Sequence, residues 1–165
     1  MPNPCKRSDL RFTRGFTLVE IMVVVVIIGL LAALGIPAFR RAQRASQNTR
    51  VVNDFRVFAQ AFEIYNTQNG GWPDGAGPGE IPSVPVSIAD TLRAASWQGS
   101  TGLGGEWQWD NTLASSGDAG ICITSYTCTE AQLAELDAKM DDGNLATGRL
   151  KKAAPTRVIY VLAGP

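Results

Sequence analysis

The sequence Gly15-Phe16-Thr17-Leu18-Val19-Glu20-Ile21 opens an apolar stretch that continues to Phe39. The whole stretch is 25 residues long and contains a single ionisable side chain, that of Glu20. At about 1.5 Å per residue, a helix of this length can cross a hydrocarbon core of roughly 30 Å. We therefore predict a membrane-spanning helix over residues 16–39, with one acidic side chain near its start.

A short basic leader precedes the apolar stretch. Residues 1–15 carry four basic side chains against one acidic side chain and end in a glycine. Signal-peptide cleavage after the helix is disfavoured, because no Ala-x-Ala pair lies between Leu30 and Ala45. A residue without a Cβ lets a protease lie close along an extended backbone, so Gly15 is a candidate cleavage point on the cytoplasmic side.

The motif Gly15-Phe16-Thr17-Leu18-Val19-Glu20 resembles the prepilin motif of the type IV pilin and type II secretion pseudopilin family. The resemblance also includes the basic leader and a proline, Pro37, in the apolar helix, and it covers residues 6–65. It implies that prepilin peptidase cleaves between Gly15 and Phe16 and methylates the amine of Phe16. It further implies that mature subunits form a helical filament, in which Glu20 meets the Phe16 amine of a neighbouring subunit.

The same resemblance implies an α+β fold with a long N-terminal α-helical spine and a small antiparallel β-sheet head. The expected parts are a removable leader at 1–15, a transmembrane helix at 16–39, and an extracytoplasmic head at 40–165 that includes the second half of the spine. The protein would cross the bacterial inner membrane once, with its N-terminus cytoplasmic before processing and its head in the periplasm or in a surface filament. The implied partners are other subunits, the prepilin peptidase, an inner-membrane assembly platform and membrane lipid.

The charge distribution does not fix this orientation by itself. Five arginines follow the span and compete with the leader in the positive-inside count, namely Arg40, Arg41, Arg44, Arg50 and Arg56. Without its leader the chain has eleven basic and fourteen acidic residues, a formal net charge of −3. We predict no nucleic-acid partner, because the chain has no basic excess to attract one.

The composition also limits the chemistry. The chain has 165 residues and no histidine, which excludes Ser-His-Asp and Cys-His nucleophiles and histidine-ligated metals. Residues 40–165 suffice for one small domain with a core of its own. We predict a structural protein and not an enzyme.

Periodicity predicts how the head is built. The helix is predicted to continue beyond the span and to end at Asn69-Gly70-Gly71, which is a stop signal. Apolar side chains recur in this part at spacings of three and four residues, namely Val51, Phe55, Phe58, Phe62 and Tyr65. A loop over 72–85 and a short helix over 87–96, capped by Ser87, come next. The remaining predicted elements are a hairpin of strands 106–110 and 120–124 with a turn at 115–118, a helix from the capping box at 129–132 to 141–143, and strands over 145–151 and 156–162.

Two features of the head raise a choice between ligand binding and structure. Trp107 and Trp109 point to the same face of the predicted strand, where they form either a sugar-binding platform or, as we favour, part of a core against the helix. The glycine-rich residues 75–79 do not predict a phosphate loop, because no strand precedes them and no Lys-Ser/Thr follows them.

Two cysteines, Cys122 and Cys128, remain once the leader is removed. Their even number and short spacing fit a disulfide that closes a small loop. On chain entropy such a bond stabilises by roughly 2–3 kcal/mol, and it persists only in an oxidising compartment. The alternative is two unrelated buried thiols, and we predict the disulfide.

Metal binding has one candidate position. Asp141 and Asp142, with Asn144 nearby, offer oxygen ligands of the kind that calcium prefers, and the resemblance implies calcium because major pseudopilins of secretion systems often bind it in a C-terminal loop. However, the sequence lacks the twelve-residue EF-hand spacing, and adjacent aspartates at a helix end are more often solvated. We predict no cofactor, with calcium as the alternative.

Together these features predict a subunit of a type IV pilus or a type II secretion pseudopilus that assembles by helix packing. The alternative is a membrane-anchored periplasmic binding module that does not polymerise. The motif favours the filament, since an anchor needs neither a glycine before the span nor an acid inside it. The sequence does not separate a pilus from a pseudopilus.

Overall fold

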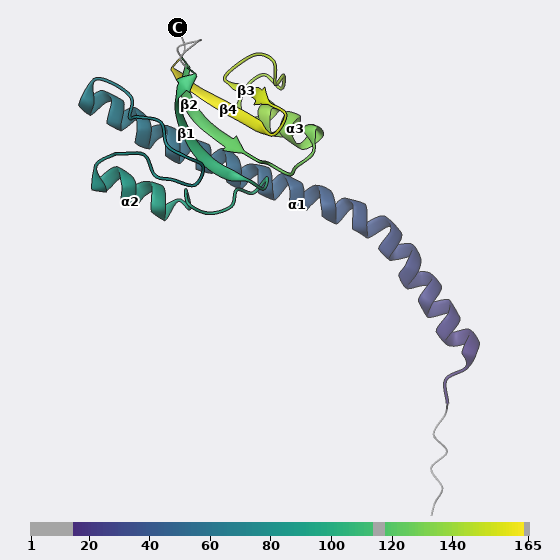
Figure 1. Ribbon diagram of the computed structural model, residues 1–165. Helices are drawn as coiled ribbons and strands as arrows, with labels where there is room; N and C mark the ends of the chain where they lie inside the picture. Colours follow the sequence, from purple (N-terminus) through teal and green to yellow (C-terminus); the bar gives the residue numbers. More distant parts are fainter. Residues whose placement is uncertain (1–14, 114–117, 164–165) are drawn as a thin grey trace, which may run out of the picture. The chain divides into compact units, whose positions relative to one another are not determined.

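The computed structural model describes residues 15–113 and 118–163 (Figure 1). Its elements follow in the order α1 (Leu18–Asn69), α2 (Val86–Ala94), β1 (Glu106–Leu113), β2 (Asp118–Thr124), α3 (Glu130–Met140), β3 (Leu150–Ala154) and β4 (Arg157–Ala163). The chain divides into two compact units after Arg41. Helix α1 extends through both units, and all other elements belong to the second unit.

The first unit contains the apolar half of α1. The helix begins at Leu18 and continues through Pro37, although a proline cannot donate a helical hydrogen bond. This helix is long and apolar enough to cross a membrane, with a mean hydropathy of 2.9 over its most apolar 18 residues and none of that window buried within the chain. It fits the membrane span predicted from the sequence.

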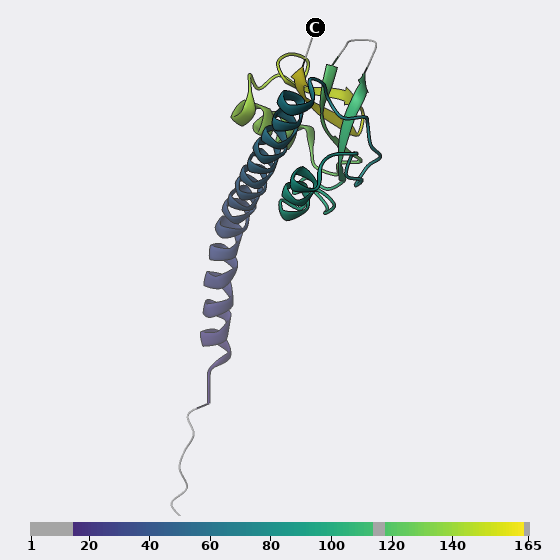
Figure 2. The same cartoon turned by 90° about the vertical axis from the view of Figure 1, so that its left-hand side faces the viewer.

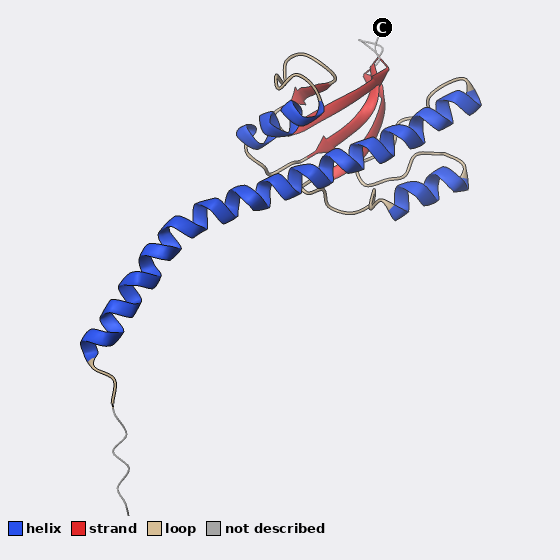
Figure 3. Cartoon of the chain, turned by 180° about the vertical axis from the view of Figure 1, so that it is seen from behind, coloured by secondary structure: helices blue, strands red, loops and turns tan. Residues whose placement is uncertain are grey.

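The second unit is built on a four-stranded antiparallel sheet of order β1-β2-β4-β3 (Figure 2). Alternate residues of its strands, such as Trp107 of β1 and Ile121 of β2, enter the main core. Apolar side chains of α1, α2 and α3 enter the same core, so the helices cover one face of the sheet (Figure 3). This arrangement confirms the predicted α+β fold with a helical spine and an antiparallel head.

Aromatic side chains of α1 and β1 form the centre of the core. The rings of Phe55 and Trp107 meet edge to face with their centroids 4.9 Å apart, and those of Phe62 and Trp109 stack at 4.0 Å. The indole N–H of Trp109 donates to the carbonyl oxygen of Pro73 at 2.9 Å. Because Trp107 and Trp109 are 1% and 0% exposed, they are core residues, and the sugar-platform alternative is wrong.

The predicted helix ends are confirmed at α1 and α3 and are wrong at the start of α2. Helix α1 ends at Asn69, and Gly70 follows with a φ of +69°, which a glycine adopts without strain. Oγ1 of Thr129 accepts a hydrogen bond from the N–H of Gln132 at 3.3 Å and so caps α3. Helix α2 begins one residue earlier than predicted, directly after Pro85, so Ser87 lies inside the helix and does not cap it.

The strands follow the predicted order, and their boundaries differ from the predicted ones by one to five residues, most of all at β3. The β1–β2 hairpin is confirmed; residues 115–117 of its predicted turn lie outside the described residues, and Asp118, the last residue of that predicted turn, is the first residue of β2. Strand β3 begins at Leu150 and not at 145, because residues 141–149 form an irregular loop. The loop over 72–85 is confirmed, and the N–H groups of Ala76 and Gly79 donate to carbonyl oxygens of β1, which covers that edge of the sheet.

Candidate functional site

The processing motif lies ahead of α1. Residues 15–17 are exposed and have no regular secondary structure, and the helix begins at Leu18. No atom of the described residues lies within 4 Å of the position that a Cβ would occupy on Gly15. The peptide bond between Gly15 and Phe16 is therefore open to an enzyme that approaches along the backbone.

Thr17 and Glu20 cap the first turn of α1. The N–H of Glu20 donates to Oγ1 of Thr17 at 3.3 Å, and the N–H of Thr17 donates to Oε2 of Glu20 at 3.5 Å. This reciprocal pair is a capping box, and it places a carboxylate at the positive end of the helix dipole. Glu20 thus has a partner within its own chain before any cleavage. A glutamine at this position would keep the cap and lose the charge.

The apolar half of α1 is not covered by other residues among those that the structure describes. Its large apolar side chains between Leu18 and Phe39 are 48% to 77% exposed. Water disfavours a surface of this kind, whereas lipid or neighbouring helices would cover it. Gly29 and Gly35 leave the helix backbone open to close approach, since no atom of the described residues lies within 4 Å of their Cβ positions. This half of the helix is therefore suited to packing against lipid and against other helices.

The predicted disulfide is absent from the structure, where Cys122 and Cys128 are both free thiols. Cys122 follows the inward-facing Ile121, so the alternation of β2 turns it to the opposite face of the sheet, where it clusters with Ile159 and Val161. Cys128 instead packs against the main core. The spacing of the two cysteines along the sequence does not reveal that they belong to different clusters.

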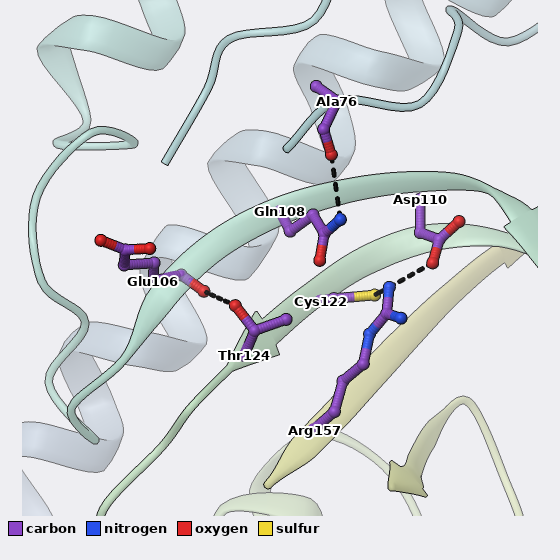
Figure 4. Close-up of polar contacts among 7 residues, drawn as sticks. All are labelled: Ala76, Glu106, Gln108, Asp110, Cys122, Thr124 and Arg157. Atoms are coloured by element: carbon purple, nitrogen blue, oxygen red, sulfur yellow. Dashed lines mark hydrogen bonds and ion pairs between the residues drawn. The ribbon is translucent and has the colours of Figure 1, made fainter. Parts of the chain in front are cut away.

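A charged pair lies beside the Cys122 thiol (Figure 4). Arg157 of β4 donates to Sγ of Cys122 at 3.3 Å and forms an ion pair with Asp110 of β1. Burial raises the pKa of Cys122 to about 11, although the guanidinium of Arg157 acts to lower it. Because the thiolate is the reactive form of cysteine, Cys122 is expected to be inert near neutral pH.

Three carboxylates meet where α3 ends. One oxygen from each of Asp137, Asp141 and Asp142 lies within 4.8 Å of the other two. Asp137 is fully buried, and its carboxylate lies beside the side chain of Asp142 and the backbone N–H of Gly143. Burial, together with the carboxylates of Asp142 and Asp141, raises the pKa of Asp137 to about 6. The predicted ligand Asn144 lies next to this group, since its N–H donates to Oδ1 of Asp142 at 2.9 Å and its side-chain oxygen accepts from the N–H of Ala146 at 3.2 Å.

Sequence reasoning missed Asp137. It follows Leu136 in a helix with an apolar side, where a single aspartate has the pattern of an ordinary surface position. The signal that was available is the spacing of four between Asp137 and Asp141, because residues four apart lie on the same side of a helix.

Comparisons with known proteins agree with the motif. Residues 10–36 match the family described as the prokaryotic N-terminal methylation motif. Prepilin peptidase-dependent protein D of Escherichia coli is 31% identical over 144 residues, which cover 79% of this chain and 97% of that protein. Fimbrial protein EcpC of Eikenella corrodens is 34% identical over 126 residues, or 70% of this chain and 82% of that protein. The chain belongs to the type IV pilin and type II secretion pseudopilin family.

The similarity to a type II secretion protein covers a smaller part of this chain than the similarity to the two relatives above. Type II secretion system core protein G of Pseudomonas aeruginosa is 42% identical over 59 residues, which are 36% of this chain and 42% of that protein. No solved structure matches the chain. Likeness to the fimbrial protein therefore extends over a larger share of both sequences than likeness to the secretion protein.

Alkylation of the native protein tests the assignment of the two thiols. We expect iodoacetamide near pH 8 to modify Cys128 in the folded mature protein without prior reduction, and to modify Cys122 only after denaturation. The reason is that Cys122 is fully buried whereas Cys128 is partly exposed, and this difference in access decides because burial raises the pKa of both thiols. Peptide mass spectrometry measures both sites. Protection of both cysteines until a reductant is added would contradict this expectation.

Proposed function

We propose that this chain is a structural subunit of a type IV pilus that enters the filament through α1 after its leader is removed. Family membership makes it a pilus or pseudopilus subunit, and the length of its similarity to a fimbrial protein favours the pilus. The observation that carries the proposal is the apolar half of α1, which has no cover among the described residues and bears one carboxylate.

Packing of α1 needs a source of specificity. Inside the bilayer, lipid tails already cover an apolar helix, so burial of apolar surface does not select one arrangement of neighbouring helices. A charge in the same environment does select, because insertion scales assign roughly 2.5–3.5 kcal/mol to a charged side chain at mid-span and less near an interface. Glu20 is the acidic side chain in the first turn of α1, and its partner can therefore determine the register of assembly.

Cleavage supplies such a partner. The new amine of Phe16 is a cation at neutral pH, and methylation leaves it charged. Within one chain Glu20 already has the capping contact with Thr17. In the filament we propose that Glu20 pairs with the Phe16 amine of a neighbouring subunit. Removing one partner of a buried charge pair typically costs about 3–5 kcal/mol, which is enough to reject a misplaced subunit.

The proposal also assigns a location and partners. The subunit crosses the bacterial inner membrane once, with its leader in the cytoplasm and its head in the periplasm until assembly. Prepilin peptidase, an inner-membrane assembly platform, membrane lipid and other subunits are the partners that this role requires. The role is structural, and we assign no catalytic residue.

An anchored binding module that does not polymerise has less support. Its predicted recognition face was the pair Trp107 and Trp109, and both are buried in the core. Such a module also has no use for a carboxylate at the start of its anchor.

Intact-mass analysis tests the processing step. Protein extracted from membranes of cells that contain prepilin peptidase should have the mass of residues 16–165 plus one methyl group, because the Gly15–Phe16 bond is exposed ahead of the helix. Gly15→Val should retain the leader, since a branched side chain obstructs close approach to the backbone. A wild-type species that keeps residues 1–15, or that begins after Ala38, would contradict the proposal.

Substitutions at Glu20 separate its charge from its capping role. Glu20→Gln keeps the capping box and removes the charge, whereas Glu20→Ala removes both. With either variant as the only subunit, we expect normal insertion and cleavage, and a yield of sheared filaments at least roughly tenfold below wild type. Immunoblots of the sheared and membrane fractions, at equal membrane levels, measure this yield.

Thr17→Ala is the matched control, because it removes the capping hydroxyl and keeps the charge of Glu20. We expect this variant to retain most of the wild-type filament yield. Wild-type yield from Glu20→Gln, combined with loss of filaments in Thr17→Ala, would mean that the cap and not the charge determines assembly.

A further inference from the structure

Strand β1 lies at one edge of the sheet, so one side of its backbone has no neighbouring strand. An edge strand presents carbonyl oxygens and N–H groups on which a strand of another chain can pair. In β1 the carbonyl oxygens of Trp107 and Trp109 face this edge, since they accept hydrogen bonds from residues outside the sheet. With its eight residues, β1 is long enough to pair with a strand of another molecule.

The two edges of the sheet are protected in different ways. Strand β3, at the other edge, has five residues that include Lys151 and Lys152, and short edge strands with lysines resist pairing. The N–H of Lys152 also donates to the carbonyl oxygen of Leu145 at 2.9 Å. Strand β1 contains neither lysine nor proline. Protection of the β1 edge therefore depends on another segment.

Residues 73–80 cover the β1 edge, and we call them the strap. They form neither a helix nor a strand. The N–H of Ala76 donates to the carbonyl oxygen of Trp109 at 3.1 Å, and the N–H of Gly79 donates to that of Trp107 at 2.8 Å. Donors three residues apart on the strap thus meet acceptors two residues apart on the strand. The strap therefore covers the edge without forming a regular ladder.

The strap offers few donors to a further strand. Pro73 and Pro78 have no N–H group, and the two donors described above are used on β1. The N–H of Gly77 donates to Oε2 of Glu80 at 3.2 Å, and the N–H of Glu80 donates to the carbonyl oxygen of Gly77 at 3.1 Å. The strap therefore ends the sheet and does not continue it.

Side chains of β1 hold the strap by its carbonyl oxygens. The carbonyl oxygen of Pro73 accepts from the indole N–H of Trp109 at 2.9 Å and from Nδ2 of Asn111 at 3.0 Å. The carbonyl oxygen of Ala76 accepts from Nε2 of Gln108 at 3.0 Å (Figure 4). A plain connection between two helices needs no such contacts. Three side chains of one strand thus fasten the strap along the edge that it covers.

We propose that the strap is an autoinhibitory contact, which prevents two heads from joining their sheets through β1. The partner that it excludes is β1 of a second copy. Identical edges come together wherever subunits are concentrated, and identical strands can pair antiparallel about a two-fold axis. The strap and β1 both lie within the second unit, so this inference does not rest on the proposed role of Glu20.

Cross-linking of heads in the full mature chain, held in detergent micelles, tests the strap. The parent protein carries Gln108→Cys, which places a thiol between the two strap contacts, and Cys128→Ser, which removes the partly exposed native thiol. Cys122 is fully buried and does not compete. A long bismaleimide then links two chains where their β1 strands are adjacent, and gel electrophoresis measures the linked dimer.

Ala76→Pro opens the strap, because it removes the N–H that donates to Trp109, and the preceding glycine accommodates a following proline. We expect this change to increase the linked dimer roughly fivefold over the parent, which is the ratio that corresponds to the loss of one net hydrogen bond. Ser83→Pro is the matched control, since Ser83 is an exposed loop residue whose N–H donates to no residue of β1 that the structure describes. It should leave the dimer at the level of the parent.

Two further variants keep the test decisive. Asn111→Ala is the second variant if Ala76→Pro does not fold, because it releases the carbonyl oxygen of Pro73 and changes no backbone group. It should also increase the dimer, by a smaller factor. Glu20→Gln, added to Ala76→Pro, separates the β1 edge from α1, and the increase should persist because the edge does not use the charge of Glu20.

Three results would overturn the strap. One is an unchanged yield of dimer in folded Ala76→Pro, or in folded Asn111→Ala where the first variant does not fold. Another is an equal increase in Ser83→Pro. The third is an increase that disappears when Glu20→Gln is added, because the dimer would then come from association of α1.

Discussion

The constraint on which this protein depends is the cost of exposing an apolar helix to water. The first half of α1 has no cover among the described residues, so it is stable only in lipid or among other helices. In our proposal, the single acidic side chain in its first turn makes one arrangement of neighbouring helices better than the others. We propose that filament formation follows from the apolar surface of α1 and from the charge of Glu20.

The second half of α1 solves a different problem, because it provides the core of the head. Phe55, Phe58 and Phe62 meet the tryptophans of the sheet and of the segment after α2, and these contacts attach the sheet to the helix. The second half of α1 thus supplies one side of the main core of the head. The opposite face of the sheet carries a smaller cluster around Cys122, with the ion pair between Arg157 and Asp110 beside it.

Features that depend on local sequence were predictable, and features that depend on tertiary contacts were not. The processing motif, the span, the aromatic stripe and the cap at Thr129 follow from short-range chemistry. The Ser87 cap failed because Pro85, with its fixed φ, starts the helix one residue earlier. The disulfide failed because strand alternation sends Cys122 away from the core. The sequence analysis named Asp141, Asp142 and Asn144 after α3 but did not reveal that Asp137 lies buried beside them.

The central claim is that Glu20 of one subunit pairs with the amine of another in the assembled filament. A cryo-electron microscopy map of wild-type filaments, at a resolution that shows side chains, measures this pairing directly. The account predicts that the Phe16 amine nitrogen of one subunit lies within about 4 Å of a Glu20 carboxylate oxygen of a neighbour, in a region closed to water. A distance between these two atoms that is too long for a hydrogen bond, with Glu20 still bonded only to Thr17 of its own chain, would contradict the account.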